Sequence, residues 1–367
     1  MHTKSAESIS GLQLFFFIVQ SQVGISILSM PYAIFHIAKT DSWLVVLLSG
    51  LLVQILIFML WMLAKIFPHN TIFETQEELL GKTVGKIFTI GYVIYFILST
   101  SLILCLFSNI VKIWLLPFTP SWVIILLMLG ISVYMVKETL QIISRFFVIT
   151  AVLFLFFLLL SIYSFKYANI LNILPIGKEG VWSILKGTTE GILPFQGIEM
   201  LLILFPYVQT TAIQKLKITT YANVCTTFFY TVLTLACLLF FSPEELPFIP
   251  QPVLYVIKSF ELSIIQRPDI VFTSSWVVMV ASTVMAFLYA ASKGMTYILP
   301  QQKRKIFVYG SAVITYIITI ACNKISTVQF LSQLISRGVL IFVVGLPTLL
   351  LILSFILKKP RQKGEPS

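Results

Sequence analysis

The sequence predicts an all-α integral membrane protein with ten transmembrane helices, arranged as two five-helix repeats of opposite orientation. Three observations support this fold class. Hydrophobic residues make up 58% of the 367 residues and charged residues only 11%, against about 25% charged residues in a soluble domain. Apolar runs recur from residue 12 to residue 357, with no polar block of domain size between them. Two of these runs, at corresponding places in the two halves, are interrupted by glycine and proline.

The ten spans follow from the rule that about 20 predominantly apolar residues cross the hydrocarbon core of a bilayer. In chain order they cover residues 12–36, 43–66, 87–110, 121–136, 146–165, 183–208, 218–241, 269–292, 306–322 and 338–357. The first run is longer than a signal-peptide core and lacks a small-residue cleavage site, so we expect it to remain as a span. The fourth and ninth are the shortest.

The spans fall into two matching sets of five. When span one is aligned with span six, and so on, the offset between the starts rises smoothly, which predicts repeat one over about 12–165 and repeat two over about 183–357. Because five is odd, the repeats must be inverted. Long connections at 71–86 and 242–268 also correspond, and each contains a plausible amphipathic helix. We expect residues 1–367 to form a single transmembrane domain.

The distribution of basic residues predicts the orientation in the membrane. With ten spans both termini lie on one side, which receives 16 of the 25 Lys and Arg residues. Loops rich in Lys and Arg face the cytoplasm, so we expect both termini there. The basic tail at 358–363 is interpreted as a topology anchor.

The first span of each repeat is the interrupted one. Residues 22–31 read QVGISILSMP and residues 191–206 read GILPFQGIEMLLILFP. Paired broken segments in the two halves are typical of a transporter binding site, whereas the simpler alternative is two ordinary helices kinked by proline and glycine. We expect discontinuous helices one and six that line a cavity.

The exposed backbone at such breaks is suited to a zwitterionic solute. Amide groups around Ser26, Ile27 and Leu28, with Gly24 before them, favour a carboxylate. Carbonyls at 191–195 would accept from an ammonium or hydroxyl group. The substrate-binding residues expected in span six are Pro194, Phe195, Gln196, Gly197 and Glu199.

Glu199 has three interpretations: a partner of a solute cation or hydroxyl, a proton carrier, or a protonated structural acid bonded to a neighbouring helix. A candidate cation site consists of Gly24 carbonyl oxygen with the hydroxyls of Ser282 and Thr283, although such hydroxyls commonly bond their own helix. No cofactor or metal site is expected, because no phosphate-binding glycine loop or Cys/His cluster is present. The basic residues are dispersed, so no nucleic-acid partner is expected, and nothing favours an enzyme.

The two broken spans in a ten-helix inverted repeat resemble the amino acid/polyamine/organocation superfamily. Within it, three stretches are similar to the spore germination permease family, the GerAB-type B subunits of germinant receptors. They are QVGISILSMP at 22–31, PFQGIEMLLILFPY at 194–207 and ELSIIQRPDIVFTSSW at 261–276. The resemblance covers nearly the whole chain and implies site residues at 24–31 and at Pro194, Gly197 and Glu199.

The resemblance also implies a function. A family member would be a permease-like, multi-pass protein of the bacterial cell membrane or inner spore membrane. It would bind a small nutrient such as an amino acid or sugar and trigger spore germination. Its partners would be the germinant, the lipid bilayer, an A subunit and a lipoprotein C subunit. The alternatives are an ion-coupled amino acid permease with the same cavity, and a membrane scaffold that only holds partner subunits.

Overall fold

The computed structural model describes residues 7–260, 266–322 and 324–357. These residues form helices and connecting loops, with one isolated β-bridge between Ile9 and Val208. Part of the stretch before predicted span eight, residues 261–265, and the basic tail at 358–363 lie outside the described residues. The chain is therefore all-helical, as predicted, over the part that can be described.

The first half of the chain contains a series of α-helices and short 3₁₀ segments. They are α2 (Gly11–Gln22), η1 (Ile25–Leu28), α3 (Met30–Ala38), η2 (Lys39–Asp41), α4 (Ser42–Ile66), α5 (Ile72–Leu80), α6 (Lys82–Trp114), α7 (Ser121–Val136) and α8 (Leu140–Tyr163), followed by η3 (Ser164–Tyr167) and η4 (Ile170–Ile173). Capping boxes start two of these helices: Ser10 with Gln13 before α2, and Thr71 with Glu74 before α5. In both, side chains satisfy amide groups that a helix start leaves unpaired.

The second half has a similar make-up. It contains α9 (Gly180–Gly191), η5 (Leu193–Phe195), α10 (Met200–Leu204), η6 (Phe205–Tyr207), α11 (Ala212–Phe240), η7 (Leu246–Phe248), α12 (Pro252–Lys258), α13 (Pro268–Ile298) and α14 (Arg304–Ala321). The last rod joins α15 (Ile325–Gly338), the π-helical segment η8 (Val339–Gly345) and α16 (Leu346–Ile356). A capping box of Thr211 and Gln214 starts α11.

Eight helical segments in the described residues are long and apolar enough to cross a membrane. They are Met30–Ile66, Lys82–Trp114, Leu140–Tyr167, Gly180–Tyr207, Ala212–Phe240, Pro268–Ile298, Arg304–Ala321 and Ile325–Ile356. Predicted span four is α7, an apolar helix of 16 residues, and predicted span one is divided between α2 and α3. The described residues thus contain eight segments of membrane-spanning length and composition, against the ten spans that the sequence predicts.

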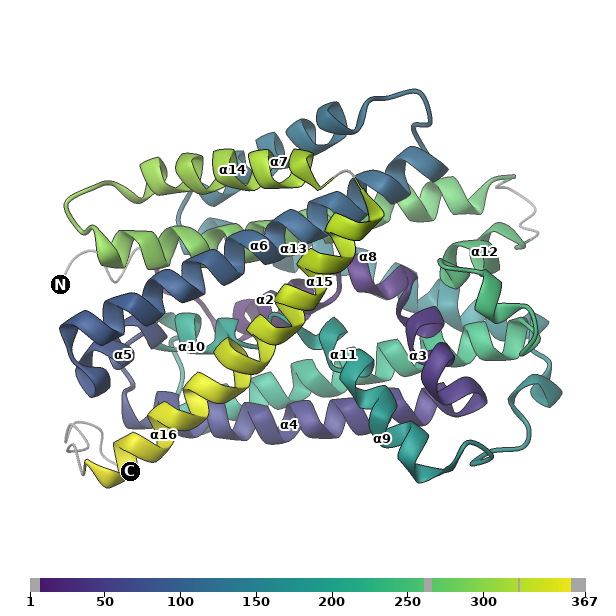
Figure 1. The fold of residues 1–367 in the computed structure, drawn as a ribbon, viewed down its shortest axis with the longest axis horizontal. Helices are drawn as coiled ribbons and strands as arrows, with labels where there is room; N and C mark the ends of the chain where they lie inside the picture. The colour runs from purple at the N-terminus through teal and green to yellow at the C-terminus, as the bar shows by residue number, and fades with distance from the viewer. Residues whose placement is uncertain (1–6, 261–265, 323, 358–367) are drawn as a thin grey trace.

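Helix α2 lies in the interior of the helix assembly (Figure 1). It packs against α8, α11 and α13, and its Leu14, Phe17 and Ile18 are fully buried. Two helix pairs run side by side around it, α6 with α13 and α4 with α11. The short helices α5 and α12, from the two long connections, lie at opposite ends of the molecule (Figure 1).

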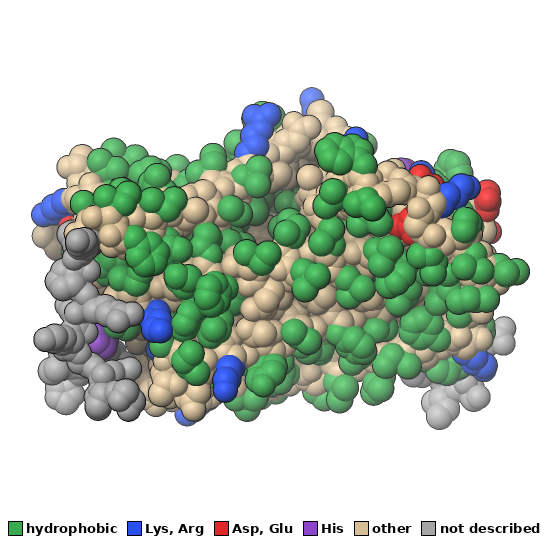
Figure 2. Space-filling view, turned by 90° about the horizontal axis from the view of Figure 1, so that it is seen from below, with side chains coloured by type: hydrophobic (Ala, Val, Ile, Leu, Met, Phe, Trp, Pro, Cys, Tyr) green, Lys and Arg blue, Asp and Glu red, His purple; other side chains and the backbone are tan. Residues whose placement is uncertain are grey.

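The outer surface is strongly apolar. Hydrophobic side chains extend along the whole length of the face in Figure 2. Large apolar residues of α4, such as Ile55 and Leu51, are 67% and 63% exposed. Contiguous apolar surface of this kind is unfavourable in water and favourable in lipid. The surface and the eight apolar segments are those of a multi-pass membrane protein.

The last helix differs most from its prediction. The predicted span began at residue 338, but the helical rod begins at Ile325. Its first part, α15, carries Ser332, Gln333, Ser336 and Arg337, which lower the local hydropathy. A sequence window that averages hydropathy therefore misses a helix that is apolar on only one side.

Candidate functional site

The first helix break separates α2 from α3. Helix α2 ends at Gln22, and Gly24 has φ −139° and ψ −117°, outside the helical region. The 3₁₀ turn η1 follows, and α3 begins at Met30 with Pro31 in its first turn. Gly24 packs so closely against Thr283 of α13 that a side-chain Cβ would collide with the threonine hydroxyl. The glycine thus lets α13 approach the break.

The second break separates α9 from α10. Helix α9 ends at Gly191, η5 contains Pro194, and the α-helix resumes only at Met200. Gly197 has φ +113°, a conformation that side chains other than glycine rarely adopt. A Cβ at Gly197 would lie 2.7 Å from the Ser21 carbonyl oxygen. The two breaks are therefore in direct contact.

Hydrogen bonds join the two breaks across more than 170 residues of sequence. The Gln22 side chain donates to the Phe195 carbonyl at 3.2 Å, and the Ser21 hydroxyl is 3.2 Å from the Gly197 carbonyl. An interrupted helix leaves carbonyls without their usual partners, and burying an unpaired carbonyl is costly. Side chains from α2 supply hydrogen-bond donors to some of the carbonyls in the second break.

Buried side chains of α11 and α13 bond further carbonyls of the two breaks. The Tyr230 hydroxyl lies 3.0 Å from the Gln22 carbonyl oxygen and 3.1 Å from that of Pro194, so it contacts both breaks. The Trp276 indole donates to the Gly24 carbonyl at 3.1 Å. Both rings are fully buried. The unwound backbone is thus held in place by the protein itself.

Glu199 lies beside the second break and is only 2% exposed. Its carboxylate accepts from the Gly197 amide at 2.8 Å and from the Tyr95 hydroxyl at 3.0 Å. The Gln196 side chain donates to the Tyr95 oxygen at 2.8 Å and to the Ser99 hydroxyl at 2.9 Å. A continuous hydrogen-bonded chain therefore runs from Gln196 through Tyr95 to Glu199.

A cavity of about 190 Å³ lies next to this chain. Segments from both breaks, together with α6 and α15, form its wall. The lining residues are Ile25, Ser26, Ser29, Met30, Ala33, Ser99, Leu102, Ile103, Leu106, Glu190, Leu193, Pro194, Gln196, Ser332, Ile335 and Ser336. Glu190 is the one charged residue among them, and five serines supply hydroxyl groups. The Glu190 carboxylate can accept hydrogen bonds from an amine, and the serine hydroxyls can both donate to and accept from the hydroxyl groups of a ligand.

The predicted substrate-binding residues divide into two groups. Ser26, Pro194 and Gln196 line the cavity. The others are absent from its lining, and the side chains of Ile27, Leu28, Phe195 and Glu199 are buried. Glu199 connects to the cavity through Tyr95 and Gln196 rather than facing it.

The three groups of the predicted cation site are each already hydrogen-bonded within the protein. The Thr283 hydroxyl lies 3.0 Å from the Gln20 carbonyl, and the Ser282 hydroxyl bonds Val278 of its own helix at 3.1 Å. The Gly24 carbonyl accepts from Trp276. Among the residues that the structure describes, no group of three or more His, Cys, Asp or Glu side chains is arranged to hold a metal ion.

Three features of the site were missed from the sequence. Glu190, which is not among the predicted site residues, is exposed and lines the cavity. Ser332 and Ser336 lie between predicted spans nine and ten, but in the structure they belong to α15 and share a helix face, being four residues apart. Tyr95 lies in an apolar run with no sequence signal of its role.

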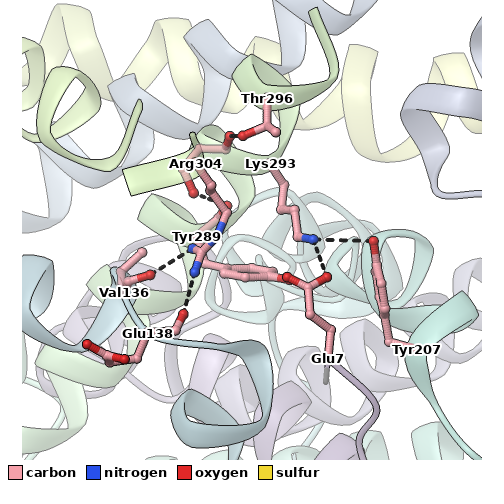
Figure 3. Close-up of polar contacts among 9 residues, drawn as sticks. Glu7, Val136, Glu138, Tyr207, Tyr289, Lys293, Thr296 and Arg304 are labelled. Carbon is pink, nitrogen blue, oxygen red and sulfur yellow. Dashed lines mark hydrogen bonds and ion pairs between the residues drawn. The ribbon is translucent and has the colours of Figure 1, made fainter. Parts of the chain in front are cut away.

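The first and last described residues of the chain lie at the same end of the molecule (Figure 1). Polar contacts close this end (Figure 3). The Lys293 ammonium forms an ion pair with Glu7 at 2.5 Å and contacts the Tyr207 hydroxyl at 3.3 Å. We call Glu7, Tyr207 and Lys293 the latch. Beside it, the Arg304 guanidinium donates to the carbonyls of Val136 and Glu138.

Backbone bonds reinforce the latch. The Ile9 amide donates to the Tyr207 carbonyl at 2.9 Å, and the Gln209 amide donates to the Ile9 carbonyl at 3.0 Å. The N-terminal segment is thereby fixed across the junction between α10 and α11 and against the end of α13. A pocket of about 520 Å³ adjoins the latch and is lined by charged residues of α5, α6 and α13, among them Glu74, Glu77 and Lys293.

The fold matches that of a solved structure. The structure superposes on the crystal structure of MhsT in complex with L-phenylalanine with a TM-score of 0.68, covering 94% of this chain and 88% of that one, at 15% sequence identity. At this identity the likeness establishes the fold. Together with the eight apolar segments and the paired breaks, it defines the class as an all-helical, multi-pass membrane protein with the MhsT fold.

The family follows from the sequence comparisons. Residues 8–328 match the spore permease family, described as spore germination proteins, and the chain belongs to this family. It is 29% identical to spore germination protein GerQB of Bacillus cereus over 78% of this chain and 79% of that protein. It is 26% identical to YndE and 22% identical to spore germination protein B2, both of Bacillus subtilis (strain 168), in each case over 97% of this chain and 98% of the relative. The resemblance inferred from the three sequence stretches is confirmed.

Proposed function

We propose that this chain is the transporter-like subunit of a nutrient germinant receptor, which binds a small nutrient in its mid-membrane cavity and triggers spore germination. The observation that carries the proposal is the cavity of about 190 Å³ between the two helix breaks, with polar groups converging on it. Membership of the spore germination family supports the biological role. A membrane protein that keeps polar groups in a cavity between two broken helices is expected to use the cavity for a solute.

The wall chemistry favours an amino acid or another small amine over a larger ligand. The volume is below the roughly 300–1,000 Å³ typical of ligand pockets. Glu190 can pair with an ammonium, and the serines suit either an amino acid or a sugar. The structural neighbour MhsT was solved with L-phenylalanine bound, which supports an amino acid occupant.

Binding would be transmitted through the chain from Gln196 to Glu199. Gln196 lines the cavity and donates to Tyr95, which in turn donates to Glu199. A solute that accepts a hydrogen bond from the Gln196 amide would weaken the bond between Gln196 and Tyr95. Glu199 holds the Gly197 amide, so the change would reach the turn where the two breaks meet.

The membrane arrangement is part of the proposal. We infer one domain over residues 1–367, with ten spans as a 5+5 inverted repeat and both termini in the cytoplasm. The opposite placement of α5 and α12 supports the inversion (Figure 1). Helices α3 and α9 beside the cavity lie toward the other end from α5 and the termini. The protein would reside in the cell or inner spore membrane with an A subunit and a lipoprotein C subunit.

A binding experiment tests the site. The purified full chain in lipid nanodiscs is heated in the presence of single amino acids and sugars, and a nutrient that raises Tm is then titrated. Gln196→Ala and Glu190→Gln should each reduce the nutrient-dependent rise. Ser275→Ala is the matched control, because this exposed hydroxyl bonds its own helix away from the cavity. An unchanged rise in both cavity variants would contradict the proposal.

An ion-coupled amino acid permease is the second candidate, favoured by the latch that closes one end of the molecule. Its coupling ion would be a proton on Glu199 or a cation at Gly24, Ser282 and Thr283. Proteoliposomes that contain this chain alone separate the two functions. Concentrative uptake of labelled amino acid driven by a sodium or proton gradient would support the permease, and saturable binding without uptake would support the receptor subunit.

A scaffold that only holds partner subunits is the third candidate. It requires neither the cavity nor Glu199. Spores that carry Glu199→Gln in this chain should respond less to nutrient if the chain is a receptor or permease. An unchanged response, together with unchanged solute binding, would favour the scaffold.

A further inference from the structure

A second polar cavity lies at the surface, close to the latch end of the molecule. Its volume is about 530 Å³, and it is formed by the N-terminal segment, the starts of α2 and α8, and the residues after η6. The lining residues are Ser8, Ile9, Ser10, Leu12, Gln13, Gln141, Arg145, Val148, Ile149 and Gln209. We propose that this cavity binds the phosphate headgroup of an anionic phospholipid.

The charge of the cavity selects an anion. Arg145 is its only charged lining residue, and no Asp or Glu lines it. Three glutamines and two serines also line the cavity and carry further groups that can donate hydrogen bonds. The Gln13 carbonyl oxygen is already bonded to the Ser10 amide at 2.8 Å, so its amide nitrogen is the group left for a ligand. A guanidinium with neighbouring amide donors is well suited to a phosphate group.

The surroundings favour a lipid over a soluble phosphate. Leu12, Ile149 and Val152 are 60%, 73% and 65% exposed, and the first two line the cavity itself. Such aliphatic side chains are expected to contact acyl chains. A ligand that satisfies both the arginine and this apolar border carries a phosphate at one end and hydrocarbon at the other.

The depth of Arg145 fits a headgroup position. The apolar segment Leu140–Tyr167 has 28 residues, about eight more than the roughly 20 needed to cross the hydrocarbon core. Part of its length therefore lies at the level of the headgroups. Arg145 is in the second turn, where an arginine reaches the phosphate layer without crossing hydrocarbon.

The position also connects the lipid to the latch. Ser8 and Ile9 line the cavity and directly follow Glu7, which pairs with Lys293. Gln209 lines it as well and is bonded to Ile9. A lipid bound here would hold the N-terminal segment against the residues after η6, and so would stabilise the closed latch.

The experiment uses the purified full chain in a neutral detergent, with Tm measured against added phosphatidylglycerol, phosphatidylcholine or inorganic phosphate. Phosphatidylglycerol should raise Tm saturably, and Arg145→Gln should weaken its apparent affinity about tenfold, as expected for the loss of a charge-assisted contact. Lys305→Gln is the matched control, because Lys305 is exposed at the start of α14 and does not line the cavity. It should bind phosphatidylglycerol with unchanged affinity.

Three outcomes would overturn the proposal. They are an unchanged affinity in Arg145→Gln, an equal loss in Lys305→Gln, and an equal stabilisation by inorganic phosphate or phosphatidylcholine. If Arg145→Gln does not fold, Gln141→Glu replaces it. That variant puts a negative charge into the same cavity and should likewise weaken phosphatidylglycerol binding; unchanged binding would overturn the proposal.

Discussion

At Gly197, both the backbone conformation and the close packing require glycine. Its φ of +113° is strained for any other residue, and an added Cβ would lie 2.7 Å from the Ser21 carbonyl oxygen. We predict that Gly197→Ala destabilises the protein by about 1–3 kcal/mol, the usual cost of a residue forced into such a conformation. Thermal unfolding of the purified chain in nanodiscs measures the effect.

Gly130→Ala provides the matched control for that substitution. Gly130 lies in α7, is exposed, and would have no heavy atom within 4 Å of an added Cβ. Alanine is the better helix former, so Tm should be unchanged or slightly higher. If both variants unfold at the same temperature as the wild type, neither the positive φ nor the close packing at Gly197 contributes to stability.

At the scale of elements, α11 connects the two breaks through a single side chain. The buried Tyr230 hydroxyl contacts one carbonyl from each break, Gln22 and Pro194. Tyr230→Phe keeps the ring and removes the hydroxyl, which should cost about 1–2 kcal/mol and reduce nutrient binding, because the breaks form the cavity wall. Tyr221→Phe on the same helix, where the ring is 64% exposed, should leave Tm and binding unchanged. Equal effects of the two substitutions would contradict this role.

Helix α15 supplies the part of the cavity wall that lies furthest along the chain from the two breaks. Ser332 and Ser336 line the cavity, whereas Gln333 between them is exposed and does not. We predict that Ser332→Leu fills part of the 190 Å³ space and abolishes the nutrient-dependent rise in Tm. Gln333→Leu, which adds an apolar side chain outside the cavity, should retain it. Retention of the rise by Ser332→Leu would exclude α15 from the binding site.

The helix breaks and the side chains that support them differ in how well the sequence predicts them. The two helix breaks can be predicted from the local sequence, because Gly24, Pro194 and Gly197 interrupt apolar runs. Their supports, Tyr95, Tyr230 and Trp276, are aromatic residues in apolar helices, where most such residues only pack. Their hydrogen bonds depend on tertiary contacts over 36 to 252 residues of sequence, so no local pattern identifies them. The start of α15 was missed for a related reason, because its polar face borders a cavity that only the assembled fold creates.

For the whole molecule, the cavity and the latch define one conformation. The cavity borders α3 and α9, whereas the latch seals the end that carries the described chain ends (Figures 1 and 3). If the protein opens first at one end and then at the other, the latch has to be released when the cavity closes. Glu7 and Lys293 have side chains that are 22% and 15% exposed, so their ion pair is only partly screened by solvent. The stability of the latch therefore depends on this pair.

Loss of the pair should open the latch end. Ser292 precedes Lys293 and is fully buried, so Ser292→Cys, in a background without the four native cysteines, serves as a reporter of access. We predict that Lys293→Gln increases the rate at which N-ethylmaleimide labels this cysteine about tenfold, since the latch loses an interaction worth somewhat more than 1 kcal/mol. The reversed pair, Glu7→Lys with Lys293→Glu, should restore slow labelling. If Lys293→Gln labels as slowly as the parent, or the reversed pair labels as fast as Lys293→Gln, the ion pair does not control access at this end.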